Sequence, residues 1–269
     1  MAAVGEPDAR SPGKLTVKLL TLARDLKRRK ARERQHLFVG EGVRAVEELL
    51  RSPLKIRGAL SAPQLLDAPR GVQLAQALRD RGVTVEAVAA KDFGSASETE
   101  SPQGVIAIAE VPARSFGDVS AGWRGVVLAL DGVQDPGNVG AIVRAAAALG
   151  AVATVALPGT VDLWNAKVVR SGMGAHFRHM AFSCTWAELD AFRASSSASV
   201  WAAAANGAPV AAPDAPSRVI LVVGNEGAGV SAEATSRAER SVSVPIAPEV
   251  ESLNVAVAAG ILLHTLVRR

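Results

Sequence analysis

The chain has 269 residues, enough for two domains or one large one, and 49% of them are hydrophobic, which fits a globular protein with a sizeable core. Its one cysteine, Cys184, excludes an intramolecular disulfide framework and a cysteine-based zinc site, and its aromatic neighbours favour a buried structural thiol. Residues 1–60 hold 14 Lys and Arg against 7 Asp and Glu, whereas the remainder holds 16 against 19. This basic front end predicts electrostatic capture of a polyanion.

The first segments of the chain are a polar tail and a basic helix. Residues 1–13 carry Gly, Pro and charges without periodicity, so we expect them to be disordered. Residues 15–34 predict a single helix, because leucines recur at three- and four-residue spacing from Leu15 to Leu26. Its other side is a candidate polyanion-binding face, with a plain solvated face as the alternative. That face consists of Arg24, Lys27, Arg28, Arg29, Lys30, Arg32 and Arg34.

Strands and helices then alternate up to a polar linker. The predicted strands are 36–39, 55–60, 83–88 and 105–111, and the predicted helices are 42–51 and 72–81. This alternation indicates a small α/β domain over residues 14–111. Residues 112–125, with Pro, Gly and Ser, predict a linker, and residues 126–269 then form a second domain.

Six apolar runs dominate the second domain. They predict strands at 126–130, 152–157, 179–182, 200–204, 219–223 and 242–244, separated by loops that include 195–199 and 208–217. Continuous apolar runs are typical of strands buried on both faces of a parallel sheet. The longest apolar stretch, 255–263, is too short to cross a bilayer, and no apolar leader follows Met1. We therefore expect a cytoplasmic protein with no membrane partner.

Residues 130–151 carry more polar chemistry than a connector needs. A predicted strand leads into a glycine-rich turn and then into a helix that starts near Val139. Asn138 is expected to cap this helix, since asparagine is a favoured N-cap residue. Arg144 lies among alanines and aliphatic residues, and a buried arginine needs an anionic partner. That partner is either an internal carboxylate or a substrate phosphate.

Two further segments near the C-terminus have the same character. The glycine-rich loop 224–229 follows a predicted strand, but its spacing matches neither the dinucleotide fingerprint nor a P-loop, and a tight structural turn is the alternative. Ser252 and Asn254 precede an apolar helix that either could cap. Glu249 and Glu251 would also favour a helix N-terminus electrostatically.

Taken together, the three segments resemble the three motifs of the SpoU/TrmH family, the RNA ribose 2′-O-methyltransferases of the SPOUT superfamily. The first motif matches at Asp131, Gly132, Pro136, Gly137, Asn138, Gly140, Ala141, Arg144 and Gly150. The second matches at Gly224, Asn225, Glu226, Gly227 and Gly229, and the third at Pro245, Ile246, Glu251, Ser252, Leu253, Asn254, Val255 and Ala258. Residues 14–111 are more weakly similar to the small RNA-binding domain that often precedes these motifs.

The resemblance implies properties that composition does not. The second domain would be a parallel-sheet domain with a deep trefoil knot, although folds rarely knot. The knot would hold S-adenosylmethionine, and the enzyme would work as a homodimer. The two-domain layout looks more like the enzymes that methylate large-subunit rRNA than like those that methylate tRNA. A tRNA ribose methyltransferase and a non-catalytic RNA-binding protein are the alternatives.

The resemblance also implies roles for individual residues. The implied catalytic residues are Arg144, Asn138, Glu226, Ser252 and Asn254. The implied cofactor contacts are Leu221, Val223, Gly224, Asn225, Gly227, Ile246, Ser252 and Leu253. The basic side of the first helix would bind RNA phosphates. No metal is implied, and His176 and His179, three residues apart, have no third ligand near them in the sequence.

Overall fold

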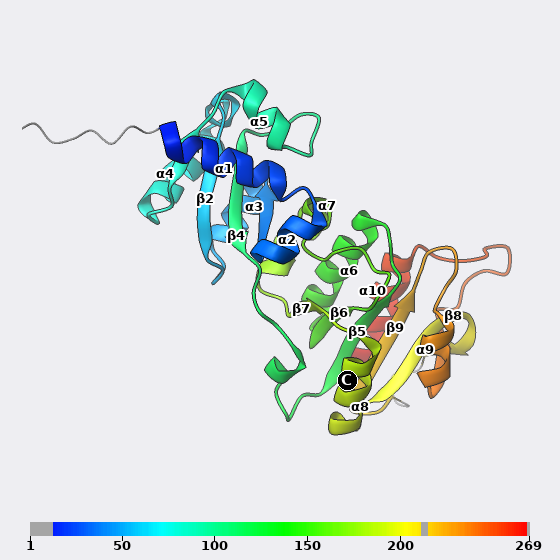
Figure 1. Cartoon of the computed structure of the whole chain (residues 1–269). Helices are drawn as coiled ribbons and strands as arrows, with labels where there is room; N and C mark the ends of the chain where they lie inside the picture. Colours follow the sequence, from blue (N-terminus) through cyan, green and yellow to red (C-terminus); the bar gives the residue numbers. More distant parts are fainter. Residues whose placement is uncertain (1–12, 211–214, 268–269) are drawn as a thin grey trace, which may run out of the picture.

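The computed structural model describes residues 13–210 and 215–267, arranged as two sheets, each flanked by helices (Figure 1). The disordered tail expected over residues 1–13 lies outside the described residues except for Gly13, which begins α1. Between the two sheets, the segment predicted as a linker contains one short turn, η2 (Phe116–Asp118), and Phe116 stacks on Phe192 of the second unit. The linker is thus packed against the second unit.

The N-terminal unit is a four-stranded sheet between two pairs of helices. In chain order its elements are α1 (Gly13–Asp25), α2 (Arg29–Gln35), β1 (Leu37–Glu41), α3 (Val43–Leu50), β2 (Ile56–Ser61), η1 (Pro63–Asp67), α4 (Pro69–Asp80), β3 (Val85–Ala87), α5 (Ala90–Ala96) and β4 (Val105–Glu110). The strand order is β1-β4-β2-β3, with only β2 and β3 parallel. Every strand predicted here is confirmed within two residues, whereas α5 was not predicted.

The single helix expected over residues 15–34 is wrong, because the chain breaks between α1 and α2. The N–H of Lys27 bonds three residues back to the carbonyl of Arg24, and Arg28 adopts an extended conformation. The guanidinium of Arg32 then donates to the free carbonyls of Leu26 and Lys27, both at 2.8 Å. A side chain from α2 therefore caps the end of α1, a contact that leucine periodicity does not reveal.

The C-terminal unit is a six-stranded, fully parallel sheet. Its elements are β5 (Gly125–Asp131), α6 (Pro136–Leu149), β6 (Ala153–Ala156), α7 (Ala166–Ser171), η3 (Ala175–Phe177), β7 (Ala181–Ser183), α8 (Trp186–Ser196), β8 (Ser199–Pro209), β9 (Arg218–Gly224), α9 (Ala232–Arg237), β10 (Arg240–Ser243) and α10 (Val255–Val267). The strand order is β10-β8-β9-β5-β6-β7, and every pairing is parallel. The predicted parallel sheet is confirmed, but β8 runs into the segment expected to be a loop.

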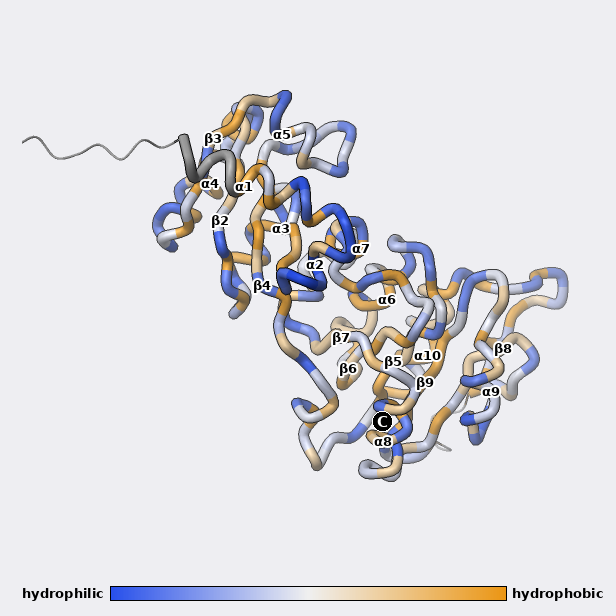
Figure 2. Tube along the Cα trace, viewed as in Figure 1, coloured by the Kyte–Doolittle hydropathy of each residue, from blue (hydrophilic) through white to orange (hydrophobic). Residues whose placement is uncertain are grey.

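Both faces of the parallel sheet are covered. Val126, Leu128 and Leu130 of β5 pack on the side of α6 and α10, whereas Val127 and Ala129 pack on the side of α8 and α9. This two-sided burial explains the continuous apolar runs of the strands, which stand out in the hydropathy-coloured trace (Figure 2).

The buried Cys184 and the two neighbouring histidines belong to this framework. Cys184 is 8% exposed, and burial together with Glu188 raises the pKa of its thiol to about 12, so the predicted structural role is confirmed. Burial lowers the pKa of His176 to about 3 and that of His179 to about 4, so both rings are neutral.

Within residues 13–210 and 215–267, no helix is long and apolar enough to span a membrane.

The contact between α6 and α7 leaves no room for a side chain at Gly140. A Cβ there would lie 1.8 Å from Ser171 Oγ and 2.5 Å from the carbonyl oxygen of Val168. We expect Gly140→Ala to lower the free energy of unfolding by about 1–3 kcal/mol, since overpacking forces the helices apart. Thermal denaturation measures this change.

The matched control is Gly94→Ala in α5, where a new Cβ would meet no heavy atom within 4 Å. Here we expect the free energy of unfolding to rise by up to about 1 kcal/mol, because alanine favours a helix. Equal melting temperatures for the two variants would contradict the packing argument.

Candidate active site

The predicted site residues gather at the carboxyl ends of the central parallel strands. The turn between β5 and α6, the loop after β9 and the segment that leads into α10 all lie at this edge of the sheet (Figure 1). In parallel α/β sheets, ligands bind in the crevice outside the carboxyl ends of the strands.

The loop after β9 is a closed, rigid turn organised by Asn225. The side-chain oxygen of Asn225 accepts from the N–H groups of Gly227 (2.9 Å) and Ala228 (3.0 Å), and its amide donates to the carbonyl of Gly132 (2.9 Å). A Cβ at Gly224 would lie 2.1 Å from the carbonyl carbon of Gly229, so only glycine fits there. The turn therefore requires glycine at Gly224 and favours it at Gly229, whose φ is +71°, and Asn225 joins the second motif to the first.

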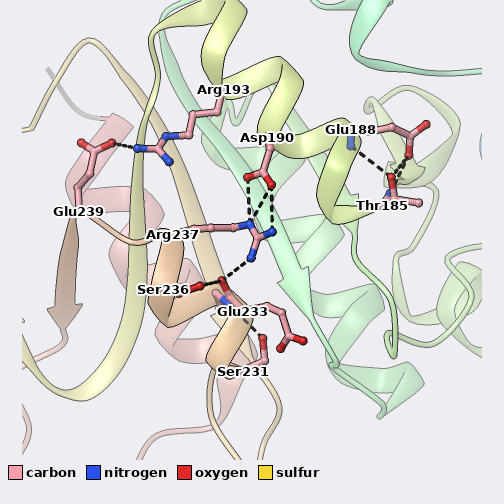
Figure 3. A network of polar contacts seen from close by, with 10 residues as sticks. Thr185, Glu188, Asp190, Arg193, Ser231, Glu233, Ser236, Arg237 and Glu239 are labelled. Carbon is pink, nitrogen blue, oxygen red and sulfur yellow. Dashed lines mark hydrogen bonds and ion pairs between the residues drawn. The ribbon is translucent and has the colours of Figure 1, made fainter.

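Buried Asp131 and helix α9 hold the far side of the same loop. Asp131, 5% exposed, accepts from the N–H of Ser231 at 2.6 Å, and Ser231 caps α9. Figure 3 shows Arg237 at the other end of α9 paired with Asp190 of α8, the closest contacts being 3.0 Å. The guanidinium of Arg237 also lies 4.9 Å from the ring centre of Trp186. Helix α9 is thus fixed at both ends.

Asn138 connects all three motifs. Its amide donates to Glu226 Oε1 at 2.9 Å, and its side-chain oxygen accepts from the amide of Asn254 at 2.9 Å. The expected N-cap role of Asn138 is wrong, because Asp135 is the N-cap and accepts from the N–H of Asn138 at 2.7 Å. Freed from capping, the Asn138 side chain faces the other two motifs.

Asn254 fixes the third motif in the same way. While its amide reaches Asn138, its oxygen accepts from the N–H of Ala256 at 2.9 Å and so caps α10. Three of the five predicted catalytic residues, Glu226, Asn138 and Asn254, therefore form one hydrogen-bonded group, which we call the polar row.

The carboxyl group of Glu226 is ionised at neutral pH. Burial alone would raise its pKa, but the hydrogen bond from Asn138 and backbone N–H groups, including those of Asp135 and Gln134, lower it. The net shift is downward, so the polar row carries a negative charge at its Glu226 end.

A cavity of about 680 Å³ opens beside the polar row. Among the predicted cofactor contacts, its walls include Val223, Gly224, Asn225, Gly227, Ile246, Ser252 and Leu253. Leu221 does not line the cavity: it is fully buried within β9, so its predicted contact is not supported. Glu226 lines the cavity as well, which places the Glu226 end of the polar row at the cavity wall.

Sequence reasoning missed several parts of the cavity wall. These parts are Ala203, Ala204, Ala205 and Asn206 of β8, Thr235 of α9, Ser241, Val242 and Ser243 of β10 with Val244 after it, and Ala258 and Leu262 of α10. Small residues in a strand carry no chemical signal. Their only clue was topological, since β8 is the parallel neighbour of β9 and ends at the same edge of the sheet.

The charged side chains that line the cavity are all acidic. Among the described residues the lining contains no Lys, Arg or His, and its two charged groups are the carboxylates of Glu226 and Glu251. Such a wall would repel a phosphate and attract a cation. The volume lies in the usual range for small-ligand sites, and apolar Val223, Ile246 and Leu253 offer surfaces for a flat ring. These features fit S-adenosylmethionine, whose sulfonium is positively charged.

Arg144 differs from its predicted setting. It is exposed on α6, and within the described part of the chain it makes no hydrogen bond or ion pair, so the buried arginine with an internal anion is wrong. It lies six residues, about 9 Å along the helix, from Asn138. A free guanidinium at this distance can bind an external anion.

The basic residues of α1, α2 and the turn between them divide into two groups. Arg24, Arg28, Arg29, Lys30 and Arg34 are exposed. Lys27 instead donates to the carbonyls of Ser95 (2.8 Å) and Ser97 (2.6 Å), and Arg32 is 5% exposed and paired with Asp162. The structure thus engages Lys27 and Arg32 in buried or half-buried contacts. The other five lie at the surface, where all but Lys30 form exposed ion pairs with Asp92, Asp25 or Glu33.

Comparison with known proteins agrees with this geometry. Residues 125–264 match the SpoU rRNA Methylase family, and residues 17–107 match the MRM3-like substrate binding domain. A 23S rRNA guanosine 2′-O-methyltransferase of Bacillus subtilis (strain 168) is 34% identical over 88% of this chain and 91% of its own length. A 23S rRNA adenosine 2′-O-methyltransferase of Streptomyces laurentii is 36% identical over 73% of this chain and 74% of its own length.

A solved structure extends the comparison to three dimensions. The SpoU methyltransferase AviRb of Streptomyces viridochromogenes, in complex with the cofactor AdoMet, superposes with a TM-score of 0.80 and 27% identity over 93% of this chain and 97% of that chain. The family match covers more than half of the sequence and includes all three motifs. The chain therefore belongs to the SpoU rRNA methylase family.

Proposed function

We propose that this chain transfers a methyl group from S-adenosylmethionine to a ribose 2′-hydroxyl of 23S-type ribosomal RNA. The observation that carries the proposal is the polar row beside a cavity whose charged lining groups are carboxylates. The two relatives described above act on 23S rRNA, and the superposed structure contains AdoMet. A cytoplasmic location, where bacterial rRNA resides, belongs to the same proposal.

The polar row acts on the attacking oxygen. Bound S-adenosylmethionine supplies a methyl carbon that its positive sulfur makes electrophilic. The ribose hydroxyl is a poor nucleophile until it is polarised. The ionised carboxylate of Glu226 accepts a hydrogen bond from this hydroxyl, and the amides of Asn138 and Asn254 fix its orientation. As the oxygen bonds to carbon, the carbon–sulfur electron pair stays on sulfur, and the hydroxyl proton passes to water at this exposed edge.

Arg144 binds the phosphate next to the target ribose. An arginine stays protonated at neutral pH, so it positions the RNA rather than acting as a base. Its exposure and lack of an internal partner leave the guanidinium free for this contact. Ser252, in the cavity wall, contributes a hydroxyl to the polar groups around the target ribose. Most of the rate enhancement then comes from orientation.

The five exposed basic residues of α1 and α2 hold more distant RNA phosphates. Such contacts give affinity without sequence information and weaken as salt rises. Figure 2 shows α2 as one of the most hydrophilic parts of the trace. Lys27 and Arg32 are left out of this proposal, because their side chains hold the N-terminal unit together.

We further propose that the protein is a homodimer and that the C-terminal unit is knotted. Val257 and Ile261 on α10 are 50% and 41% exposed, although large apolar side chains are usually buried. Helix α10 packs beside α6, the helix that carries Arg144. The knot is what the resemblance to the SpoU family implies for residues 125–264.

The direct test of the function is transfer of labelled methyl from S-adenosylmethionine to total RNA, followed by separation of rRNA and tRNA. We expect label in large-subunit rRNA at one linkage that resists alkali, because a methylated 2′-oxygen cannot attack the adjacent phosphate. Label confined to tRNA would replace the proposed substrate, and unlabelled RNA would refute the activity.

Arg144→Ala tests the phosphate contact. We expect the protein to fold and bind S-adenosylmethionine normally while methyl transfer falls about 10³-fold, since the guanidinium orients the RNA in the transition state. Steady-state kinetics with rRNA measure the fall. Arg144→Lys should be intermediate, because it keeps the charge but loses the fork.

The control for Arg144 is Arg81→Ala, which removes another exposed arginine, at the end of α4. Near-normal activity of Arg144→Ala would rule out the assigned role, and an equal loss in both variants would point to a general effect of charge.

Ile261→Asp tests the dimer. We expect this substitution to convert the protein to monomers, because it buries a charge at the proposed interface. Light scattering after size exclusion measures the mass. Leu66→Asp, at a 59% exposed leucine of η1, is the control and should leave the dimer intact. A monomeric native protein, or an unchanged dimer in Ile261→Asp, would contradict the proposed face.

A further inference from the structure

A buried ion pair joins the two units of the chain. The guanidinium of Arg32 on α2 contacts Asp162 Oδ2 through two nitrogens, at 2.7 and 2.6 Å, and both side chains are largely buried. Asp162 lies in the loop before α7 of the C-terminal unit, 130 residues away in sequence. Its other oxygen accepts from the N–H of Trp164 at 2.9 Å. The pair is therefore satisfied on both sides and fixes α2 to that loop.

Aromatic side chains continue the contact around this ion pair. Phe38 of β1 packs against Trp164 (ring centres 4.5 Å apart) and Phe177 (5.8 Å). A second, more exposed ion pair joins Glu48 of α3 to Arg178 at 2.7 Å. One hydrophobic cluster runs from the N-terminal sheet through these rings to α6. The two units share a core, so the N-terminal unit is docked on the second unit.

From this contact a packed route leads to the polar row. Helix α7 follows Trp164 directly and lies against β1 on one side and α6 on the other. Ser171 Oγ of α7 lies 3.1 Å from the carbonyl oxygen of Pro136, in addition to carbonyls of its own helix, and Gly140 packs against the same helix. Asn138 is two residues beyond Pro136. The position of α2 is thus transmitted to the polar row by tightly packed groups.

Helix α2 presents two different faces. Its inner face holds Arg32 and Ala31, which are buried, and its outer face holds exposed Arg29, Lys30 and Arg34. RNA held on the outer face is therefore held at a fixed distance from Asn138 and Arg144. The polar row and Arg144 are proposed to contact ribose and phosphate, which every nucleotide has. The distance from the RNA held on α2 to the polar row is therefore what can distinguish one ribose from its neighbours.

We propose that Arg32 and Asp162 are positioning residues that set which ribose along the RNA reaches the polar row. This inference rests on the proposed function. The aromatic contacts and the Glu48–Arg178 pair keep the units associated without the buried pair, so its loss allows α2 to shift. A shift of about 1 Å at a reacting centre can cost on the order of 10²-fold in rate.

The test replaces both charges at once, with Arg32→Met combined with Asp162→Leu, because removing one would leave the other buried and unpaired. The full-length variant and the native protein methylate unmodified rRNA, and every 2′-O-methylated position is mapped and quantified. We expect methyl groups to spread to neighbouring nucleotides and kcat/KM for RNA to fall about 10- to 100-fold, with S-adenosylmethionine affinity unchanged. A purely structural role would not alter the pattern of positions.

Arg32→Lys is the second variant, since it keeps a buried charge but cannot reach Asp162 and two carbonyls together. If the double variant does not fold, the methylated positions mapped with Arg32→Lys decide whether the inference holds. The control is Arg193→Met with Glu239→Leu, a 2.7 Å pair remote from α2, which should leave the methylation pattern unchanged. An unchanged pattern in the folded Arg32 variants would overturn the inference. A native protein that labels no rRNA would instead refute the proposed function.

Discussion

The side-chain amide of Asn138 is the contact on which the rest of the site depends. Its nitrogen donates to Glu226, 88 positions away in the sequence, and its oxygen accepts from Asn254, 116 positions away. One small group therefore joins three separate segments. This is possible because Asp135 caps α6 and because Pro136, at the first helical position, needs no donor partner. The hydrogen bond to Glu226 also helps to keep that carboxylate ionised. Helix start, loop closure and site electrostatics are thus consequences of one local arrangement.

Opposite charges mark two different parts of the site. The cavity is lined by the carboxylates of Glu226 and Glu251, whereas Arg144 and the exposed basic residues of α2 carry the positive charge that the proposed function assigns to RNA. A cationic cofactor and a polyanionic RNA would therefore each approach a surface of complementary sign. The polar row lies at the boundary between these surfaces, where the electrophilic carbon and the ribose oxygen would have to meet. The same separation would disfavour RNA phosphate from entering the cofactor cavity.

The sequence predicts the parallel sheet and the members of the polar row, but not how several of them are arranged. Continuous apolar runs suffice for the sheet, because its strands are buried on both faces. Arg144 was misplaced since its alanine neighbours look apolar while Ala141, Ala147 and Ala148 are in fact exposed. Small residues do not mark which side of a helix is buried. The walls that β8 and β10 contribute to the cavity were missed for the same reason.

Long-range contacts are the second feature that could not be predicted from the sequence. Arg32 belongs to a basic run that, apart from Lys27, is otherwise exposed, and nothing in its local sequence predicts a partner 130 residues away. The same guanidinium also donates to the carbonyls of Leu26 and Lys27, where α1 ends, so one side chain explains both the broken helix and the loss of Arg32 from the predicted RNA-binding face. Only a specific carboxylate makes burial of such a charge tolerable.

The two 23S rRNA relatives act on different bases, guanosine and adenosine, although the family shares its motifs. The polar row and Arg144 offer contacts suited to ribose and phosphate, so the choice of nucleotide must be made elsewhere. An N-terminal unit on a flexible tether could raise affinity but could not set a distance. A unit docked through a shared core and a buried ion pair can do both. In this fold, substrate selection is therefore a matter of how rigidly α2 is held relative to α6.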